Sequence, residues 1–339
     1  MEHTKEISYI KVKVWVFIAV NILMLSGCAS IMHDTAHGSN DISCTLPFTF
    51  PEEITETRII MLGDLHGTHE APQLAAELAC TLARKGFPVT LAIEMPHDEQ
   101  AALDAYIASD GGDTAQSALL TRSFWKLRRD GLNTVATLAM IDRIRLLRQR
   151  GNSLAILPID ASSRDFEQSL PQITTEQEQR VRDTLKEMGM NFDQQTQLIE
   201  KLPGLIVRER SMAKYMIAAM RAEPSRRFVV FLGNGHTSKL ADVPIPGRPS
   251  MASALASQVK SLLSLNIAAI KYTFWGCLSE RDCGKHEFEQ PTPLREELVK
   301  RGSGIHIGYP GQGPQGAYDG TIIFENTTPA KPAVDVATP

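Results

Sequence analysis

Residues 59–72 read IIMLGDLHGTHEAP, a stretch that joins an apolar run to a polar loop. The apolar run ends at Gly63, ionisable residues and glycines follow, and Pro72 begins an Ala/Leu-rich helical pattern. The stretch therefore predicts a strand, a tight loop and the start of a helix. In an open parallel sheet such a loop lies at the carboxyl end of its strand, where ligand crevices form. We therefore expect Asp64 and His66 at the mouth of a crevice.

From Arg58 onward, strand patterns alternate with helix patterns, which predicts an α/β fold. We expect a mainly parallel central sheet with helices on both faces, and a helical cap insertion at about residues 162–203. Residues 302–320 are rich in Gly and Pro and predict a mobile loop. The expected strands are 58–64, 89–95, 154–160, 228–233, 266–275 and 321–325, and the expected helices are 72–85, 97–108, 115–129, 133–150, 204–221 and 251–264.

The N-terminal residues carry the pattern of a bacterial lipoprotein signal. Lysines precede the apolar run Val14–Leu25, which is shorter than the roughly 20 residues of a spanning helix. The sequence LSGC at 25–28 then resembles a lipobox, in which Cys28 is lipidated and becomes the first residue. A plain secretory signal with a chance cysteine is the alternative. Ala29 after the cysteine favours an outer-membrane lipid anchor with the protein facing the periplasm.

These features predict a signal peptide at 1–27, a tether at 28–50, a single domain at 51–330 and a flexible tail at 331–339. The formal net charge of −4 and pI near 6.2 offer no basic excess that would bind nucleic acid. Four cysteines follow Cys28, and an oxidising compartment favours disulfides. Cys277 with Cys283 closes a short polar loop, and Cys44 with Cys80 is the pair that remains. Neither pair has the two-residue spacing of a structural zinc site.

Polar residues stand at the carboxyl ends of several expected strands. They are Asp64, His66, Glu94, Asp160, Asn234 and His236. Ionisable groups at buried strand ends cost free energy unless they are paired, so their recurrence indicates one shared site. His69 and Glu70, at the start of the next helix, are weaker candidates for a supporting role, because a glutamate there complements the helix dipole. No G-x-S-x-G nucleophile motif occurs, and no phosphate-binding glycine loop follows a strand.

Two chemistries remain open for these residues. In the first, His66 takes a proton from water, Asp64 or Glu94 fixes its tautomer, and a second histidine with an arginine stabilises the oxyanion. In the second, Asp64, His66, Glu94 and His236 bind a divalent metal that acidifies water. Sequence spacing does not separate the two, because Glu94 and His236 come from distant strands.

Five motifs together resemble the EreA/ChaN-like superfamily, over about residues 58–326. This superfamily includes erythromycin esterases and ChaN-type haem-binding lipoproteins, and it resembles the TIKI/TraB proteases more distantly. The resemblance implies His66 as base or ligand, Asp64 and Glu94 as its carboxylate partners, Arg208 as an anion contact and His236 as second imidazole. The motifs are GDLHGT at 63–68, AIE at 92–94, RERSMA at 208–213, GNGH at 233–236 and YDGTII at 318–323.

The first motif has its acid two residues before His66, which is closer to the ChaN pattern than to the G-E-x-x-H-G of the esterases. ChaN proteins are outer-membrane lipoproteins, in agreement with Cys28, and bind haem through surface tyrosine and histidine ligands. Tyr309 and Tyr106 are the candidate tyrosines here. We therefore expect a lipoprotein with a hydrolase-like pocket that binds a small molecule. The alternatives are a haem-binding protein of iron uptake without turnover, and an envelope scaffold with a vestigial pocket.

Overall fold

The computed structural model describes residues 43–168, 170–241, 248–279, 282–311 and 313–335. By its contacts, the described part of the chain forms one compact unit. The predicted signal peptide, Cys28 and most of the predicted tether lie outside the described residues. Within the described part of the chain, no helix combines the length and apolarity needed to cross a bilayer.

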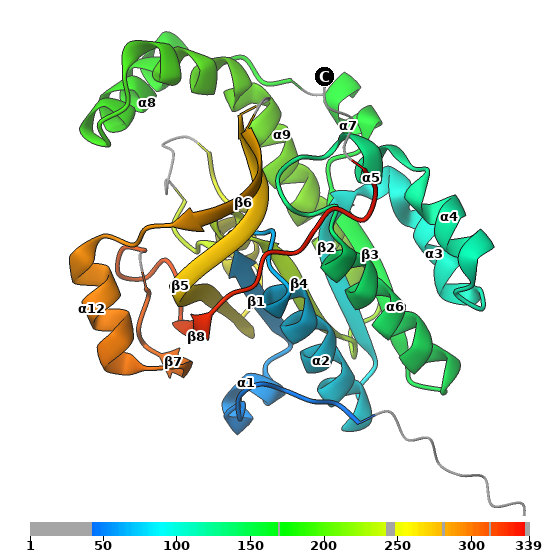
Figure 1. Cartoon of the computed structure of the whole chain (residues 1–339). Helices are drawn as coiled ribbons and strands as arrows, with labels where there is room; N and C mark the ends of the chain where they lie inside the picture. The colour runs from blue at the N-terminus through cyan, green and yellow to red at the C-terminus, as the bar shows by residue number, and fades with distance from the viewer. Residues whose placement is uncertain (1–42, 169, 242–247, 280–281, 312, 336–339) are drawn as a thin grey trace, which may run out of the picture. The chain divides into compact units, whose positions relative to one another are not determined.

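An eight-stranded, mainly parallel sheet forms the centre of the described unit (Figure 1). The order is β3-β2-β4-β1-β5-β8-β7, and β6 pairs with β5 outside this path. The β5–β6 and β7–β8 pairs are antiparallel, and the other pairs are parallel. The strands are β1 (Ile59–Asp64), β2 (Val89–Pro96), β3 (Leu154–Asp160), β4 (Arg227–Gly233), β5 (Leu262–Ser279), β6 (Asp282–Phe288), β7 (Gly304–Ile307) and β8 (Gly320–Asn326).

Helices cover both faces of this sheet, which confirms the predicted α/β class. On β1, Ile60 and Leu62 pack into one core with α2, α3 and α6, while Ile59 and Met61 pack into a second core with α9 and α11. This division follows from the alternation of side chains along a strand. The helices are α1 (Glu52–Glu56), α2 (Glu70–Arg84), α3 (Gln100–Ala108), α4 (Asp113–Leu120), α5 (Ser123–Leu127), α6 (Val135–Gln149), α7 (Ser163–Gln168), α8 (Thr175–Glu187), α9 (Phe192–Ala222), α10 (Asn234–Thr237), α11 (Met251–Ala256) and α12 (Thr292–Arg301), with a 3-10 turn η1 at His97–Glu99.

The helical insertion consists of α7, α8 and the first part of α9. Capping boxes begin α8 at Thr174 and α9 at Asn191. A separate small core, with Val181 and Leu202 among its members, joins α8 to α9. Helix α9 runs through Pro203, so the prediction of a helix that starts at residue 204 was wrong. Pro203 removes one backbone donor, and the packing on both sides of it keeps the helix continuous.

The chain after residue 250 differs most from the prediction. The helix expected to reach residue 264 ends at Ala256, and β5 then continues to Ser279. Strand β6 and helix α12 were not predicted, because β6 is exposed and highly charged and lacks an apolar alternation. Strand β7 lies inside the region expected to be a mobile loop. Most of the Pro/Gly-rich loop expected at 243–249 lies outside the described residues.

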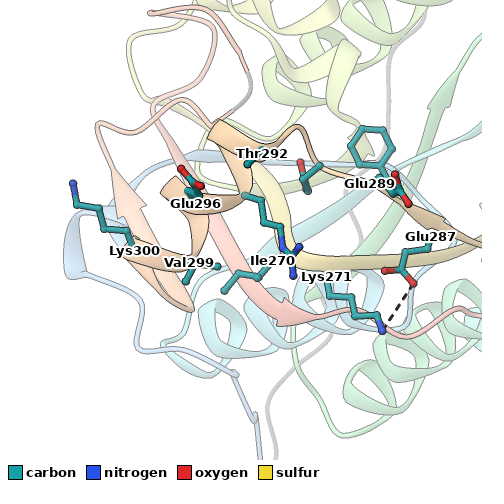
Figure 2. Close-up of a pocket in the computed structure, with 11 residues that line it drawn as sticks. Ile270, Lys271, Glu287, Glu289, Thr292, Glu296, Val299 and Lys300 are labelled. Carbon is teal, nitrogen blue, oxygen red and sulfur yellow. Dashed lines mark ion pairs between the residues drawn. The ribbon is translucent and has the colours of Figure 1, made fainter.

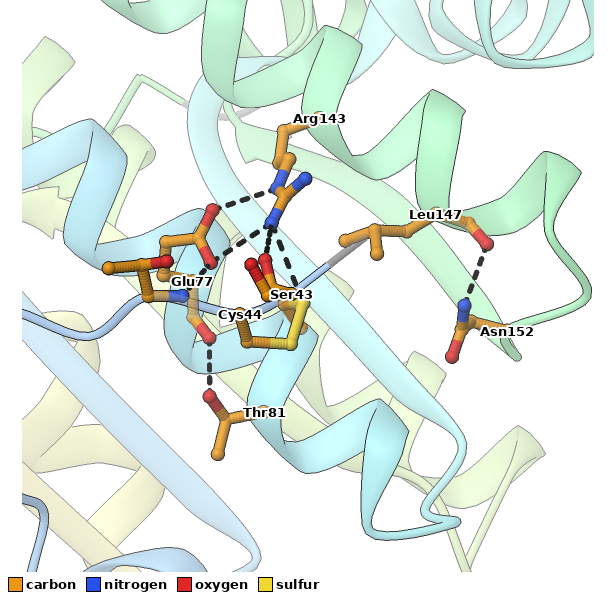
Figure 3. Close-up of a disulfide and its surroundings, with 9 residues drawn as sticks. Ser43, Cys44, Glu77, Thr81, Arg143, Leu147 and Asn152 are labelled. Carbon is orange, nitrogen blue, oxygen red and sulfur yellow. Dashed lines mark hydrogen bonds and ion pairs between the residues drawn. A yellow bond between two sulfur atoms is a disulfide. The ribbon is translucent and has the colours of Figure 1, made fainter. Parts of the chain in front are cut away.

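Both expected disulfides are present, Cys44–Cys80 and Cys277–Cys283. Cys44–Cys80 joins the first described segment to α2, as Figure 3 shows. The buried carboxylate of Glu77 strengthens this connection, because it accepts hydrogen bonds from the Thr45 N–H at 2.8 Å and from Arg143 Nε at 2.8 Å.

Residues 328–333 lie across two loops of the domain. Ala330 N–H donates to the Gly67 carbonyl at 2.8 Å, and Ala333 N–H donates to the Asn133 carbonyl at 2.9 Å. The Val135 N–H donates to the Lys331 carbonyl at 2.9 Å. The partners in these hydrogen bonds lie roughly 200 or more positions apart in sequence, so the local sequence contains no signal for them.

Candidate functional site

The loop after β1 holds His66 in a constrained backbone conformation. His66 has a φ of 67° and is the one described residue other than glycine with a positive φ. A non-glycine residue in this region marks strain that the surroundings must maintain. The next residue, Gly67, also has a positive φ, and a Cβ there would lie 2.0 Å from the Trp275 carbonyl oxygen. Only glycine therefore fits at this position, and β5 fixes the loop from behind.

Asp64 supports this loop from the end of β1. Its carboxylate is 1% exposed; Oδ2 accepts the His66 N–H at 2.9 Å, and Oδ1 accepts the Tyr272 hydroxyl at 2.5 Å. The His66 Nδ1 atom lies 3.7 Å from Oδ2, so the ring and the carboxylate interact through charge more than through a hydrogen bond. Asp64 therefore fixes both the backbone and the electrostatic surroundings of His66. Nothing in the local sequence distinguishes Tyr272 from an ordinary core aromatic residue.

Glu94, at the end of β2, is the centre of the site. Its Oε2 atom accepts the Gly233 N–H at 2.8 Å and lies 3.3 Å from His66 Nε2. A Cβ on Gly233 would stand 3.0 Å from His66 Nε2, so the glycine leaves room for this approach. The other oxygen, Oε1, lies 3.5 Å from His236 Nε2. One buried carboxylate thus connects the two histidines.

Two arginines bind the same carboxylate and connect it to Asp160 at the end of β3. Arg208 Nη2 lies 2.6 Å and Arg128 Nη2 2.8 Å from Glu94 Oε1. Arg208 also donates to both Asp160 oxygens, at 2.8 Å and 2.7 Å. The Arg128 and Arg208 side chains are 15% and 21% exposed, so they form the accessible rim of the site. Arg128 was missed from the sequence, because nothing local distinguishes it from the neighbouring basic residues.

His236 is held from its other side by a second buried acid. Its Nδ1 atom lies 2.7 Å from Glu209 Oε1, and Glu209 also binds Arg248 and accepts the Met251 N–H at 2.8 Å. Glu209 is 1% exposed. It belongs to the RERSMA motif, and that position beside Arg208 was the one sequence signal that could have identified it. Arg248 had no such signal.

The structure therefore brings together Asp64, His66, Glu94, Arg208 and His236. It adds four residues that were not predicted from the sequence: Arg128, Glu209, Arg248 and Tyr272. The contact of Asn234 is made by its backbone, whose carbonyl accepts a hydrogen bond from the Tyr318 hydroxyl at 2.9 Å. His69 and Glu70 have structural contacts. The His69 N–H donates to the Thr328 carbonyl at 2.9 Å, and Glu70 Oε2 accepts the Thr328 N–H at 2.9 Å.

Electrostatics of the cluster favour the charged forms of its members. Burial lowers the pKa of His66, but Asp64 and Glu94 outweigh this and raise it to about 10. Burial likewise opposes protonation of His236, but Glu94 and Glu209 raise its pKa to about 9. The pKa of Glu94 is lowered well below its usual range, because the two histidines outweigh its desolvation. Both imidazoles are therefore cations at neutral pH.

The predicted metal ligands do not fit a shared divalent ion. Asp64 approaches the Nδ1 side of the His66 ring and Glu94 approaches the Nε2 side, so one ion cannot reach all three. Two guanidinium groups also bind Glu94 Oε1 and would repel a metal cation. Among the described residues, Cys44, Glu77 and Cys80 do converge on one point, but the disulfide removes the thiolates.

A surface cavity of about 830 Å³ lies away from this cluster, between β5, β6 and α12 (Figure 2). Its lining mixes apolar residues such as Ile270 and Val299 with acids such as Glu296 and bases such as Lys300. None of the candidate site residues lines it.

Solved structures of other proteins share the fold of this chain. The structure resembles a mutant of the erythromycin esterase EreC in its open conformation, at 15% identity and a TM-score of 0.55, covering 84% of this chain and 94% of that chain. It also resembles a protein from Bacillus cereus (14%, TM-score 0.52, 84% and 92% covered) and a succinoglycan biosynthesis protein (13%, TM-score 0.54, 83% and 90% covered). At these identities the likeness establishes the fold alone. Curated protein sequences gave no match.

The sequence profile of one family covers most of the site. This family is described as haem-binding uptake, Tiki superfamily, ChaN, and its profile matches residues 50–248. The matched residues carry β1 to β4 and include Asp64, His66, Glu94, Arg208 and His236. They span more than half of the chain, and the predicted EreA/ChaN-like resemblance is confirmed. The chain therefore belongs to the ChaN family of the Tiki superfamily.

Proposed function

We propose that this chain hydrolyses a carboxylic ester or amide at the cluster centred on Glu94. The observation that supports this most is the His66 imidazole placed between the carboxylates of Asp64 and Glu94 at the carboxyl end of a parallel sheet. Such a ring can exchange a proton with water, and its carboxylate neighbours stabilise the imidazolium that results. The esterase structure in the comparison shares this fold.

The residues divide between proton transfer and charge stabilisation. His66 takes a proton from the attacking water, while Arg128 and Arg208 at the accessible rim stabilise the oxyanion. His236, protonated at neutral pH, adds positive charge from the other side of Glu94. Because the pKa of His66 is about 10, a small fraction of the ring is neutral at pH 7. The rate constant for hydrolysis therefore rises with pH from 7 to about 9, where loss of the His236 proton begins to oppose the increase.

A pH series of kcat/KM with p-nitrophenyl acetate and an anilide analogue tests this proposal. The wild type should turn over at least one probe with a rate that increases with pH, and His66→Gln and Glu94→Gln should abolish turnover. The matched control is Glu77→Gln, which alters a buried acid bound by an arginine far from the cluster. A rate that falls with increasing pH would make His66 an acid, and undiminished turnover in both site variants would refute the hydrolase.

Haem binding without turnover is the second candidate, and the family profile supports it. Neither candidate tyrosine, Tyr106 or Tyr309, has a free hydroxyl and an open ring face at the surface, as a surface iron ligand would. Tyr106 is 2% exposed and donates its hydroxyl to Asp142 at 2.8 Å. Tyr309 is partly exposed, but the Arg301 guanidinium carbon lies 3.8 Å from its ring centroid. A haemin titration followed by absorption tests this. A saturable shift that survives His66→Gln, in a protein inactive on both probes, would favour binding over hydrolysis.

We also propose that lipidated Cys28 anchors the protein to the outer membrane, facing the periplasm. The supporting observation is the LSGC sequence directly after the apolar run, followed by Ala29. Labelling cells with a palmitate analogue should mark the wild type and leave Cys28→Ala unlabelled. Membrane fractionation should then find the label in the outer membrane. Equal labelling of the wild type and Cys28→Ala would refute lipidation at Cys28. Label confined to the inner membrane would refute the assignment to the outer membrane.

A further inference from the structure

A second cavity, of about 490 Å³, lies beside the loop that carries His66. This volume lies within the range of small-molecule sites, roughly 300 to 1,000 Å³. None of its lining residues belongs to the cluster around Glu94. The lining residues are Trp275, Lys285, Pro329, Lys331, Pro332, Val334 and Asp335.

The wall of this cavity is bonded directly to the His66 loop. The Trp275 N–H donates to the Gly67 carbonyl at 2.9 Å, and Ala330, next to Pro329, donates to the same carbonyl at 2.8 Å. Thr68 and Pro329 form an antiparallel bridge. The wall of the cavity is therefore held by main-chain hydrogen bonds to Gly67, the residue directly after His66.

The lining combines flat apolar surface with unpaired positive charge. Trp275 is half-buried, and the pyrrolidine rings of Pro329 and Pro332 lie in the same wall. Lys285 and Lys331 are exposed, and within the described part of the chain neither side chain forms an ion pair. The Asp335 carboxylate, also exposed, lies at the rim with them. A few polar groups around an apolar, aromatic wall are typical of a binding site for one class of ligand.

We propose that this cavity binds an acidic saccharide, with a sugar ring on Trp275 and its carboxylate between Lys285 and Lys331. The C–H groups on one face of a pyranose ring are weakly positive, and the face of an indole ring is negative, so the two surfaces attract. The ammonium groups select for a carboxylate through charge. The Asp335 carboxylate can accept hydrogen bonds from sugar hydroxyls. This site does not depend on hydrolysis at Glu94.

Isothermal titration of the full-length chain in mild detergent with digalacturonate, and with neutral galactobiose as control, tests the proposal. Digalacturonate should bind saturably, and galactobiose roughly fivefold to tenfold more weakly, because exposed ion pairs contribute modestly. The double variant Lys285→Gln/Lys331→Gln should bring digalacturonate to the affinity of galactobiose and remove its salt dependence. Lys271→Gln/Lys300→Gln, which changes two lysines of the cavity in Figure 2, should bind as the wild type does.

Trp275→Ala should abolish binding of both sugars, while Trp275→Phe should retain part of it. The lysine variants alter exposed side chains and leave the fold intact, so they test the site even if Trp275→Ala is unstable. Equal affinity for the two sugars would refute the charge selection. Undiminished binding by Trp275→Phe and by the double lysine variant would refute the site. Saturable binding of a porphyrin that these variants abolish, without saccharide binding, would refute the assigned ligand class.

Discussion

We expect the folded protein to lose stability as the pH rises from 7 to 10, because the folded state holds a proton on His66 tightly. The pKa of this histidine is raised from 6.5 to about 10, since the neighbouring carboxylates outweigh the effect of burial. The raised pKa contributes its full stabilisation below pH 6.5, and this stabilisation is lost as the pH rises through 10. The shift corresponds to about 4 kcal/mol at pH 7, nearly all of which is lost at pH 10.

Urea unfolding at pH 7 and pH 10 measures this difference. The free energy of unfolding of the wild type should fall by about 3 to 4 kcal/mol more than that of His66→Gln, which has no titrating ring. His236 remains in both chains, so its own titration contributes to both curves. His97→Gln is the matched control, because His97 stacks on Tyr215 with 3.7 Å between ring centroids and lies outside the cluster. The free energy of unfolding of His97→Gln should change with pH as that of the wild type does.

A direct titration of the imidazole by nuclear magnetic resonance gives the refuting result. If the His66 ring in the wild type loses its proton near pH 6.5, the two carboxylates do not hold the charge as their positions imply. Parallel pH dependence of stability in the wild type and His66→Gln would lead to the same conclusion. Either outcome would also remove the reason to expect hydrolysis to accelerate between pH 7 and pH 9.

Three further predictions concern other parts of the structure. Glu94→Gln removes the carboxylate shared by both histidines and should lower both of their pKa values, seen in the same resonance titration; unchanged values would contradict its central role. Gly67→Ala should destabilise the fold by about 2 to 4 kcal/mol in urea unfolding, because the new methyl group meets a carbonyl oxygen at a positive φ; wild-type stability would disprove the tight contact. Cys44→Ser/Cys80→Ser should cost about 4 kcal/mol, since the disulfide spans 36 residues; a loss under 1 kcal/mol would show that Glu77 and its partners suffice.

The parallel sheet and the polar strand ends were predictable because local patterns encode them. An apolar run that breaks into a polar loop predicts the end of a strand, and the carboxyl ends of neighbouring parallel strands meet at one edge. This reasoning placed Asp64, Glu94 and Asp160 on separate strands that the structure brings together. The order of the strands was not predictable, since it depends on which crossovers bury the two cores.

The residues that were missed act through distant partners. Tyr272 lies in the middle of an 18-residue strand, where an aromatic residue is ordinary core, and only its contact with Asp64 gives it a role. Arg128 follows a short helix among other basic residues, and its partner lies 34 positions away. Strand β6 was not predicted from the sequence, for a different reason. Its pairing is fixed by the long β5 and the adjoining disulfide, and its exposed surface leaves no apolar period.

The main-chain donors and acceptors supplied by residues 328–333 also have a consequence for truncated forms of the chain. The Gly67 carbonyl accepts the Ala330 N–H and the His69 N–H donates to the Thr328 carbonyl, and both partners follow β8, which ends at Asn326. A chain that stops at Asn326 retains every described strand of the sheet, but it lacks part of the hydrogen bonding that supports the loop on which His66 lies. Such a truncated chain should therefore keep its β-sheet and hold the His66 loop less rigidly.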